Sequence, residues 1–276
     1  MAVETAPPLI ERVAHHAAAS GAHESDIPEL PNLITLLQSR LPDHPFVSWL
    51  HHWDTLVFAA VVALALCLVT WRYARKPATI PWGWQNLLEL FVEGMDQLVQ
   101  SIVGPHGRRY TPFIGTLFLY IWLMNLLVLI PGLKSPTSSL NTTVGLAIVV
   151  FCYVQWVGLR TQGLRRYLDH LAGSPRDVIG WLLVPFMLPI ELIGTLVKPL
   201  SLSLRLGINI FAEDTLLAVL AGLGITVGLA LHLPIGIPLQ VFVIPLVLIF
   251  STVQALVFSL LSTVYISLML PSEDHH

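Results

Sequence analysis

The sequence PIELIGTLVKPLSLSLRLGINIFAEDTLL, residues 189–217, is apolar enough to lie in a membrane, yet it carries five ionisable side chains. They are Glu191, Lys198, Arg205, Glu213 and Asp214. Apolar and small residues flank Arg205 on both sides, and an arginine at membrane depth costs roughly 2.5–3.5 kcal/mol on insertion scales. Because arginine stays protonated under ordinary conditions, it needs a partner or a water path. The stretch therefore predicts a path for an ion or a substrate.

The whole chain has the composition of an integral membrane protein. Of its 276 residues, 55% are hydrophobic and 11% are charged, with a mean hydropathy of +0.73, whereas soluble domains carry about 25% charged residues. The apolar runs are continuous rather than alternating, which favours helices over a barrel. The sequence contains no nucleotide-binding motif, so we do not expect the chain to be an enzyme on its own, and we expect no cofactor and no metal. Cys67 and Cys152 lie inside apolar runs and are expected to be buried.

The chain divides into two regions. Residues 1–50 form a polar extension rich in His, Pro and Ala, which we interpret as a solvated tail rather than a metal site. The first apolar run begins only after Asp54, so no cleavable signal peptide is expected. Residues 51–276 form the membrane domain. Its expected segments are a span at 54–72, an amphipathic helix at 82–103, spans at 111–131 and 142–160, and two longer apolar segments at 178–231 and 239–270.

Segment 82–103 differs from the spans. Its apolar residues recur at helical spacing, while Glu89, Glu93, Asp96 and Gln100 occupy other positions. We expect this helix to lie along the membrane surface rather than to cross it. A helix packed on a soluble partner is the alternative.

Basic residues predict the orientation. They follow the first span, precede the second and follow the third: Arg72, Arg75, Lys76, Arg108, Arg109, Arg160, Arg165 and Arg166. Since basic residues gather on the cytoplasmic side of spans, we place the N-terminus outside and the C-terminus in the cytoplasm.

The two last segments are longer than one perpendicular span of about 20 residues. The first of them contains Pro185, Pro189 and Pro199, and prolines bend helices. We therefore predict five membrane-embedded helices plus the amphipathic interfacial helix, with the last two strongly tilted and paired as an antiparallel hairpin.

The ionisable residues of this hairpin have a helical register. Glu191, Lys198 and Arg205 are seven residues apart, which leaves only about 20° between successive members on an ideal helix. Asn209 extends the resulting stripe by one turn, Glu213 lies about 80° from Arg205, and Asp214 lies roughly 180° away. The last segment adds Ser251, Thr252, Gln254, Ser259, Ser262 and Thr263. Helix packing is the competing explanation for the hydroxyls, and snorkelling to the interface is the competing explanation for Lys198.

These residues carry a resemblance to a known family. KPLSLSLRLGINIFAEDTLLAVLAGL (198–223) resembles the signature of subunit a of the F-type ATP synthase, the membrane stator that faces the rotating c-ring. The segments WDTLVFAAVV, YIWLMNLLVLIPGL, NTTVGLAI and STVQALVFSLLSTVYISLML follow in the expected order. The resemblance covers about residues 45–276, and the motif around Arg205 is highly specific.

The resemblance implies roles for individual residues. Arg205 matches the essential arginine that faces the c-ring carboxylates. Asn209, Asp214 and Gln254 match polar positions of the half-channel open to the outside, and Glu191, with Ser201, belongs to the half-channel open to the cytoplasm. Asp54 matches a further acidic position. Two positions depart from the family pattern: Asp214 stands where many bacterial members have Glu, and Val247 stands where they commonly have His. Glu213 is the candidate to compensate.

The resemblance also implies the function and the partners. The chain would carry protons to and from the c-ring carboxylates and couple their flow to rotation and ATP synthesis, in a bacterial inner membrane. Its partners would be the c-ring, the peripheral-stalk b subunits, the catalytic soluble sector and the lipid bilayer, with no nucleic acid. A self-contained secondary transporter is the alternative, although such proteins usually show inverted repeats and none is evident here. A purely structural membrane anchor is a third possibility, which would leave the charged stripe unexplained.

Overall fold

The structure, a computed structural model, describes residues 53–74, 83–130, 132–133, 135–171, 178–230 and 238–270. The described residues are organised as helices joined by short connections, and no strand occurs among them. The polar extension at 1–50, with its histidines, lies outside the described residues.

Five helices are long and apolar enough to cross a membrane. They are α4 (Asp54–Ala74), α6 (Thr111–Leu126), α7 (Leu140–Leu171), α8 (Val178–Ala230) and α9 (Ile244–Leu268). This finding confirms the predicted all-α membrane architecture with five embedded helices. Short 3-10 turns, which the sequence did not predict, complete the connections: η2 (Pro105–Arg109), η3 (Leu127–Leu129), η4 (Pro136–Ser138) and η5 (Leu239–Phe242).

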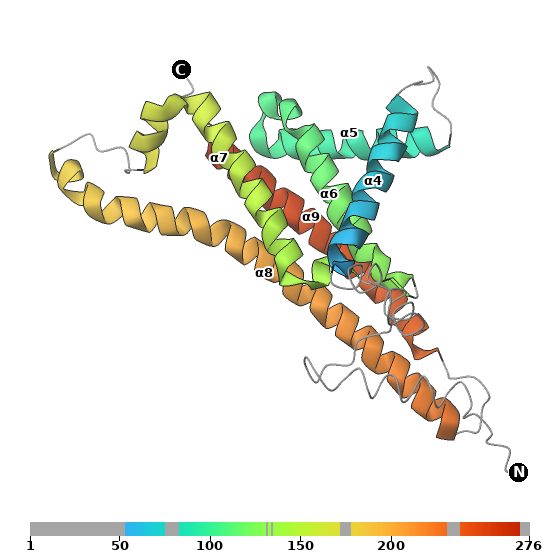
Figure 1. Cartoon of the computed structure of the whole chain (residues 1–276). Helices are drawn as coiled ribbons and strands as arrows, with labels where there is room; N and C mark the ends of the chain where they lie inside the picture. The colour runs from blue at the N-terminus through green and yellow to red at the C-terminus, as the bar shows by residue number, and fades with distance from the viewer. Residues whose placement is uncertain are drawn as a thin grey trace, which may run out of the picture.

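The amphipathic helix α5 (Trp84–Val103) lies across the bundle rather than along it (Figure 1). One face, with Met95 and Val99, is buried against α6 and α9, whereas Leu87, Leu90 and Val92 on other faces are exposed. Asp96 fixes the corner between α5 and α6, because its carboxylate accepts hydrogen bonds from Gln100 Nε2 (2.7 Å) and Thr111 Oγ1 (2.7 Å).

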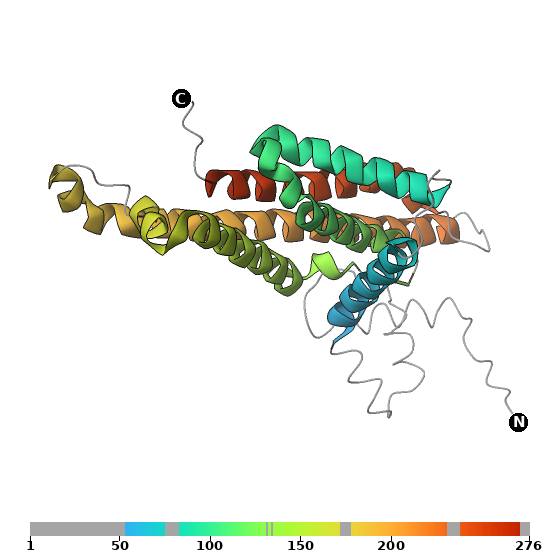
Figure 2. The ribbon, with the colours of Figure 1, turned by 90° about the horizontal axis from the view of Figure 1, so that it is seen from above.

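Helix α8 runs without interruption through Pro185, Pro189 and Pro199. It is a single, gently curved helix that passes obliquely beneath α7 (Figure 1), and α9 runs beside it when the molecule is seen from above (Figure 2). The sequence predicted a tilted or bent segment here because no single perpendicular span accommodates its length. The last helix begins at Ile244, after the η5 turn.

The core lies where α6, α7, α8 and α9 meet. Ile114 and Ile121 of α6, Leu206 of α8, and Phe258 and Ile266 of α9 are all fully buried. Many large apolar side chains of α7, α8 and α9 are exposed, for example Ile148, Ile208 and Phe250, as expected of a surface that faces lipid.

The prediction for the cysteines was wrong. Cys67 and Cys152 are free thiols on exposed helix faces. An apolar run predicts burial only when water is the solvent; in a membrane the outward face is apolar too, so position in such a run does not locate the interior.

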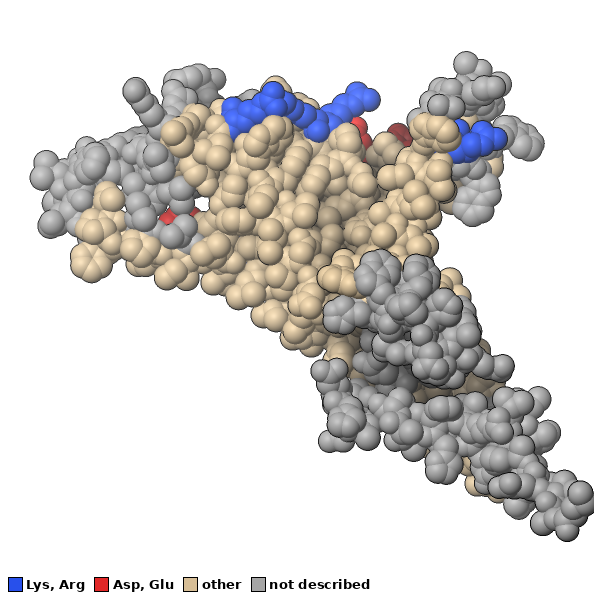
Figure 3. Space-filling model, in the orientation of Figure 1, with Lys and Arg blue, Asp and Glu red and all other residues tan. Residues whose placement is uncertain are grey.

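Basic side chains gather along one edge of the face drawn in Figure 3, over the end of α4 and over η2 and α7. The figure's orientation is that of Figure 1, in which α4 reaches this edge with its C-terminal end. The described basic residues of these segments thus lie at the same level of the bundle, as a consistent membrane topology requires.

Candidate functional site

The charged residues of α8 lie on one unbroken helix. Because the helix is continuous from Val178 to Ala230, the seven-residue spacing keeps Glu191, Lys198 and Arg205 on one side of it. Lys198 Nζ lies 6.0 Å from the centroid of the Tyr265 ring on α9. Glu191 is partly buried, and its backbone carbonyl accepts a hydrogen bond from Thr195 Oγ1 at 2.7 Å.

Arg205 itself is exposed on α8. Among the residues that the structure describes, it has no hydrogen-bond or ion-pair partner, and its charge acts electrostatically on Tyr265. Ser201, one turn earlier, is also exposed, as are the apolar neighbours Leu204 and Ile208. The arginine is therefore presented outward, on an otherwise apolar face.

Two hydrogen bonds one turn apart join α8 to α9. Asn209 Nδ2 donates to Gln254 Oε1 at 2.9 Å, and Ser251 Oγ donates to Glu213 Oε2 at 3.3 Å. We call these four residues the polar seam. The two helices are antiparallel along the seam, because Asn209 of α8 pairs with Gln254 of α9 and the later Glu213 pairs with the earlier Ser251. The resemblance implied Asn209, Asp214 and Gln254 as polar positions of one half-channel; the structure brings Asn209 and Gln254 into contact.

Glu213, not its neighbour Asp214, is the carboxylate that faces α9. Glu213 is 8% exposed, whereas Asp214 is only partly buried and lies on a different side of α8. Val247, one turn before Ser251 on α9, is 1% exposed and belongs to the same buried face. The carboxylate of the seam is therefore next to the buried face of α9 that carries Val247.

Asp54 stands apart from the seam and has a local role. It opens α4, where its carboxylate accepts hydrogen bonds from the Thr55 backbone N–H (2.6 Å) and hydroxyl (3.0 Å). A carboxylate in the first turn of a helix complements the helix dipole.

A close helix contact beside Arg205 was missed by the sequence interpretation. A Cβ atom added at Gly207 would lie 2.9 Å from Leu140 Cδ2 and 3.1 Å from Thr143 Oγ1. Gly207 thus leaves room on α8 for two side chains from the start of α7, two residues from the arginine. Small residues at helix interfaces are the general device for such contacts in membranes. Sequence could have signalled Gly207 as a small residue in an otherwise bulky run.

Comparison with known proteins agrees with this arrangement. A family model described as ATP synthase A chain matches residues 55–267. The chain is similar to ATP synthase subunit a of Protochlamydia amoebophila, with 45% identity over 250 residues that cover 91% of this chain and 92% of the relative. It is also similar to ATP synthase subunit a of Moorella thermoacetica (35% identity; 78% and 89% covered) and of Helicobacter pylori strain G27 (32%; 84% and 96%). On this similarity over most of its length, and on five helices able to span a membrane, the chain belongs to the ATP synthase subunit a family.

Proposed function

We propose that the chain is the ion-translocating stator subunit of an F-type ATP synthase. Two offset aqueous half-channels would meet the c-ring at mid-membrane and carry protons to and from its carboxylates, so that proton flow drives rotation. The observation that carries this proposal is an exposed arginine on α8 one turn from the polar seam that joins α8 to α9. One charge crossing 100 mV releases about 2.3 kcal/mol, so several protons are needed for each ATP.

The outer half-channel would follow the polar seam. Asp214 follows Glu213 on α8, on a different side of the helix, and Asn209, Gln254 and Glu213 offer the proton successive polar groups within the seam. Glu213 would take the role of the histidine that many bacterial members of the family have at position 247. Its carboxylate contacts Ser251, which lies one turn from Val247.

Arg205 would separate the two half-channels. A cation next to a c-ring carboxylate favours its ionised form, and the same charge repels a proton that moves directly from one half-channel to the other. The lack of an internal ion-pair partner among the described residues leaves the guanidinium available to a carboxylate from outside the chain. Once protonated, a c-ring carboxyl can turn into lipid because desolvation penalises only the charged form.

The inner half-channel would lie toward the other end of the stripe. Glu191 is partly buried there, and Ser201 is exposed one turn before Arg205. The ring would contact the exposed apolar face of α8, which includes Leu200, Leu204, Ile208 and Phe211. The remaining partners would be the b subunits and the catalytic soluble sector, in a bacterial inner membrane with the N-terminus outside and the C-terminus in the cytoplasm.

The test is ion flux through the whole complex in reconstituted vesicles. Arg205→Ala should abolish ATP-coupled pumping while the complex still assembles. Arg205→Lys should also fail, since an ammonium is compact, differently hydrated and able to lose its proton. An Arg205→Lys complex with normal coupling would refute the role assigned to the arginine.

A further inference from the structure

A small space lies between α7, α8 and α9, on the Glu191 side of Arg205 along α8. About 20 Å³ of it is open to the centre of a water-sized sphere. By this measure a water molecule needs roughly 10–15 Å³. The space therefore has room for about one water and excludes a larger ligand.

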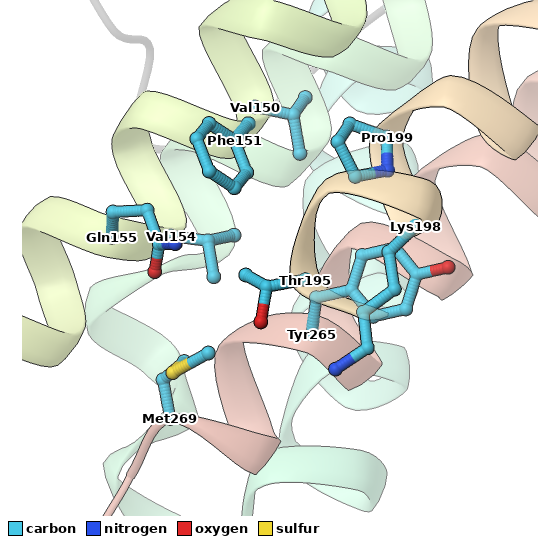
Figure 4. Close-up of a pocket in the computed structure, with 9 residues that line it drawn as sticks. All are labelled: Val150, Phe151, Val154, Gln155, Thr195, Lys198, Pro199, Tyr265 and Met269. Carbon is cyan, nitrogen blue, oxygen red and sulfur yellow. The ribbon is translucent and has the colours of Figure 1, made fainter. Parts of the chain in front are cut away.

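Four of the side chains that line this space are polar, and they come from all three helices (Figure 4). They are Gln155 of α7, Thr195 and Lys198 of α8, and Tyr265 of α9. Positions 195 and 198 lie between Glu191 and Ser201, the stretch of α8 proposed for the inner half-channel. Gln155 thus adds a polar group from α7 to a path whose proposed residues all lie on α8.

The end of α7 holds the Gln155 side chain in one orientation. The helix changes direction at Gly163, where φ is 76°, and this turn brings Tyr167 back to Gln155. Tyr167 Oη donates to Gln155 Oε1 at 2.9 Å, and the ring packs on Gly158, where an added Cβ would lie 3.3 Å from Tyr167 Cε2. Because Oε1 is engaged by Tyr167, the amide N–H groups remain as donors. Within the described segments they have no acceptor.

The polar groups around the space suit water. Gln155 Nε2 and Lys198 Nζ are donors. The Thr195 hydroxyl donates to the Glu191 carbonyl at 2.7 Å, which leaves its oxygen as an acceptor. Figure 4 shows Gln155 on one side of the space and Lys198 on the other, with Thr195 between them. A water in this space therefore finds both donors and an acceptor in the walls, as buried waters require.

We propose that Gln155 is a positioning residue of the inner half-channel. Held by Tyr167, its amide keeps water in the space beside Lys198, and a proton released by a c-ring carboxyl leaves along water that includes this position. The amide neither gains nor loses the proton; it acts through the water that it holds. This inference rests on the proposed function and adds α7 to the walls of the path.

The test is ATP-coupled proton flux through the whole complex in reconstituted vesicles. Gln155→Leu has nearly the same volume but forms no hydrogen bond, so flux per assembled complex should fall by about tenfold. Gln155→Glu keeps one oxygen for Tyr167 and another for water, and should retain most of the flux. Tyr167→Phe frees the amide to rotate and should lower flux less than Gln155→Leu.

Gln162→Leu is the matched control, the same substitution about two turns later on α7. Gln162 Nε2 donates to the Met269 carbonyl at 2.7 Å, so this side chain also ties α7 to the end of α9. Its loss should lower the stability of the complex without lowering flux per assembled complex. An equal loss of flux in both Leu variants would make the role of Gln155 structural and overturn the proposal.

A second measurement tests contact with water directly. Silver ions are about as small as a water molecule and bind thiols, so they should inhibit flux in Gln155→Cys. They should not inhibit the wild type, whose Cys152 lies on an exposed, outward face of the same helix. Silver inhibition of Gln155→Cys no greater than that of the wild type would overturn the proposal, even if Gln155→Leu fails to assemble.

The two proposals fail in different ways. Wild-type flux in Gln155→Leu, with Arg205→Ala inactive, would refute the role of Gln155 alone. Normal coupling in Arg205→Ala would refute the proposed function itself.

Discussion

Asn209 on α8 donates a 2.9 Å hydrogen bond to the side-chain carbonyl of Gln254 on α9, and so connects the helix that carries Arg205 to its neighbour one turn beyond the arginine. Gln254 is 6% exposed, while Asn209 is exposed on the same side of α8 as Arg205. One end of this hydrogen bond therefore lies in the interior and the other at the surface. A proton that reached Gln254 from outside would find Asn209 as the next polar group toward Arg205.

The pair can be tested by a double-mutant cycle. Asn209→Leu and Gln254→Leu each remove one partner at similar volume, and each should lower proton flux because a polar step of the path is lost. Their coupling in complex stability should be about 0.6 kcal/mol, the average for hydrogen bonds between membrane helices. Flux in the double variant should fall no further than in the more severe single variant, since both act on one step.

Thr252→Val is the control for this cycle. Thr252 lies two positions before Gln254 and accepts a 2.9 Å hydrogen bond from Trp122 Nε1 of α6. Its loss should cost stability without lowering flux per assembled complex. If Thr252→Val reduces flux as much as Gln254→Leu, the effect of the seam is structural.

Sequence predicted the architecture because hydropathy and length dominate membrane folding. The long run from 178 to 231 appears as α8 with nearly the same bounds, and the prolines did not end it. Neighbouring helices and local adjustments satisfy the carbonyls that prolines free in a membrane, which the local sequence cannot reveal.

The site was predictable only in part. The register of Arg205 and Asn209 followed from 3.6 residues per turn. The choice between Glu213 and Asp214 did not, because adjacent residues differ by 100° and only the position of α9 decides which one is buried. The Gly207 contact depends on the approach of α7, a long-range relationship that no local pattern contains.

Gly207→Ala should destabilise the complex. The added Cβ would lie 2.9 Å from Leu140 Cδ2 and 3.1 Å from Thr143 Oγ1, so both side chains must shift. The exposed Leu140 can turn away, but the buried Thr143 has little room, and a typical overpacking cost is about 1–3 kcal/mol. The measurement is the thermal stability of the assembled complex, together with its coupled flux. Gly222→Ala on the same helix is the matched control, because a Cβ there meets nothing within 4 Å. Equal tolerance of both substitutions would show that the α7–α8 contact is loose.

Asp96→Ala should loosen the corner between α5 and α6. It removes the acceptor of Thr111, whose side chain is 6% exposed, and a buried hydroxyl without a partner costs about 1–3 kcal/mol. Arg108→Gln is the comparison, because the Arg108 Nε to Asp96 Oδ2 distance is 3.9 Å and the arginine side chain is 83% exposed. Exposed pairs of this kind contribute little. Limited proteolysis between α5 and α6 should increase in Asp96→Ala only; cleavage that rises equally in Arg108→Gln would assign the corner to the ion pair.

Glu213→Gln should lower proton flux by more than tenfold, since an amide of nearly the same shape cannot carry a proton between the outside and Arg205. The structure also predicts a rescue. Val247 lies one turn from Ser251, the residue that donates to Glu213, so Val247→His would place a titratable ring on the same buried face of α9. Flux should recover in part in the double variant Glu213→Gln/Val247→His, and it should not recover in Glu213→Gln/Val253→His, where the new ring lies on an exposed face. Wild-type flux in Glu213→Gln alone would remove this carboxylate from the path and leave Asp214 as its acidic member.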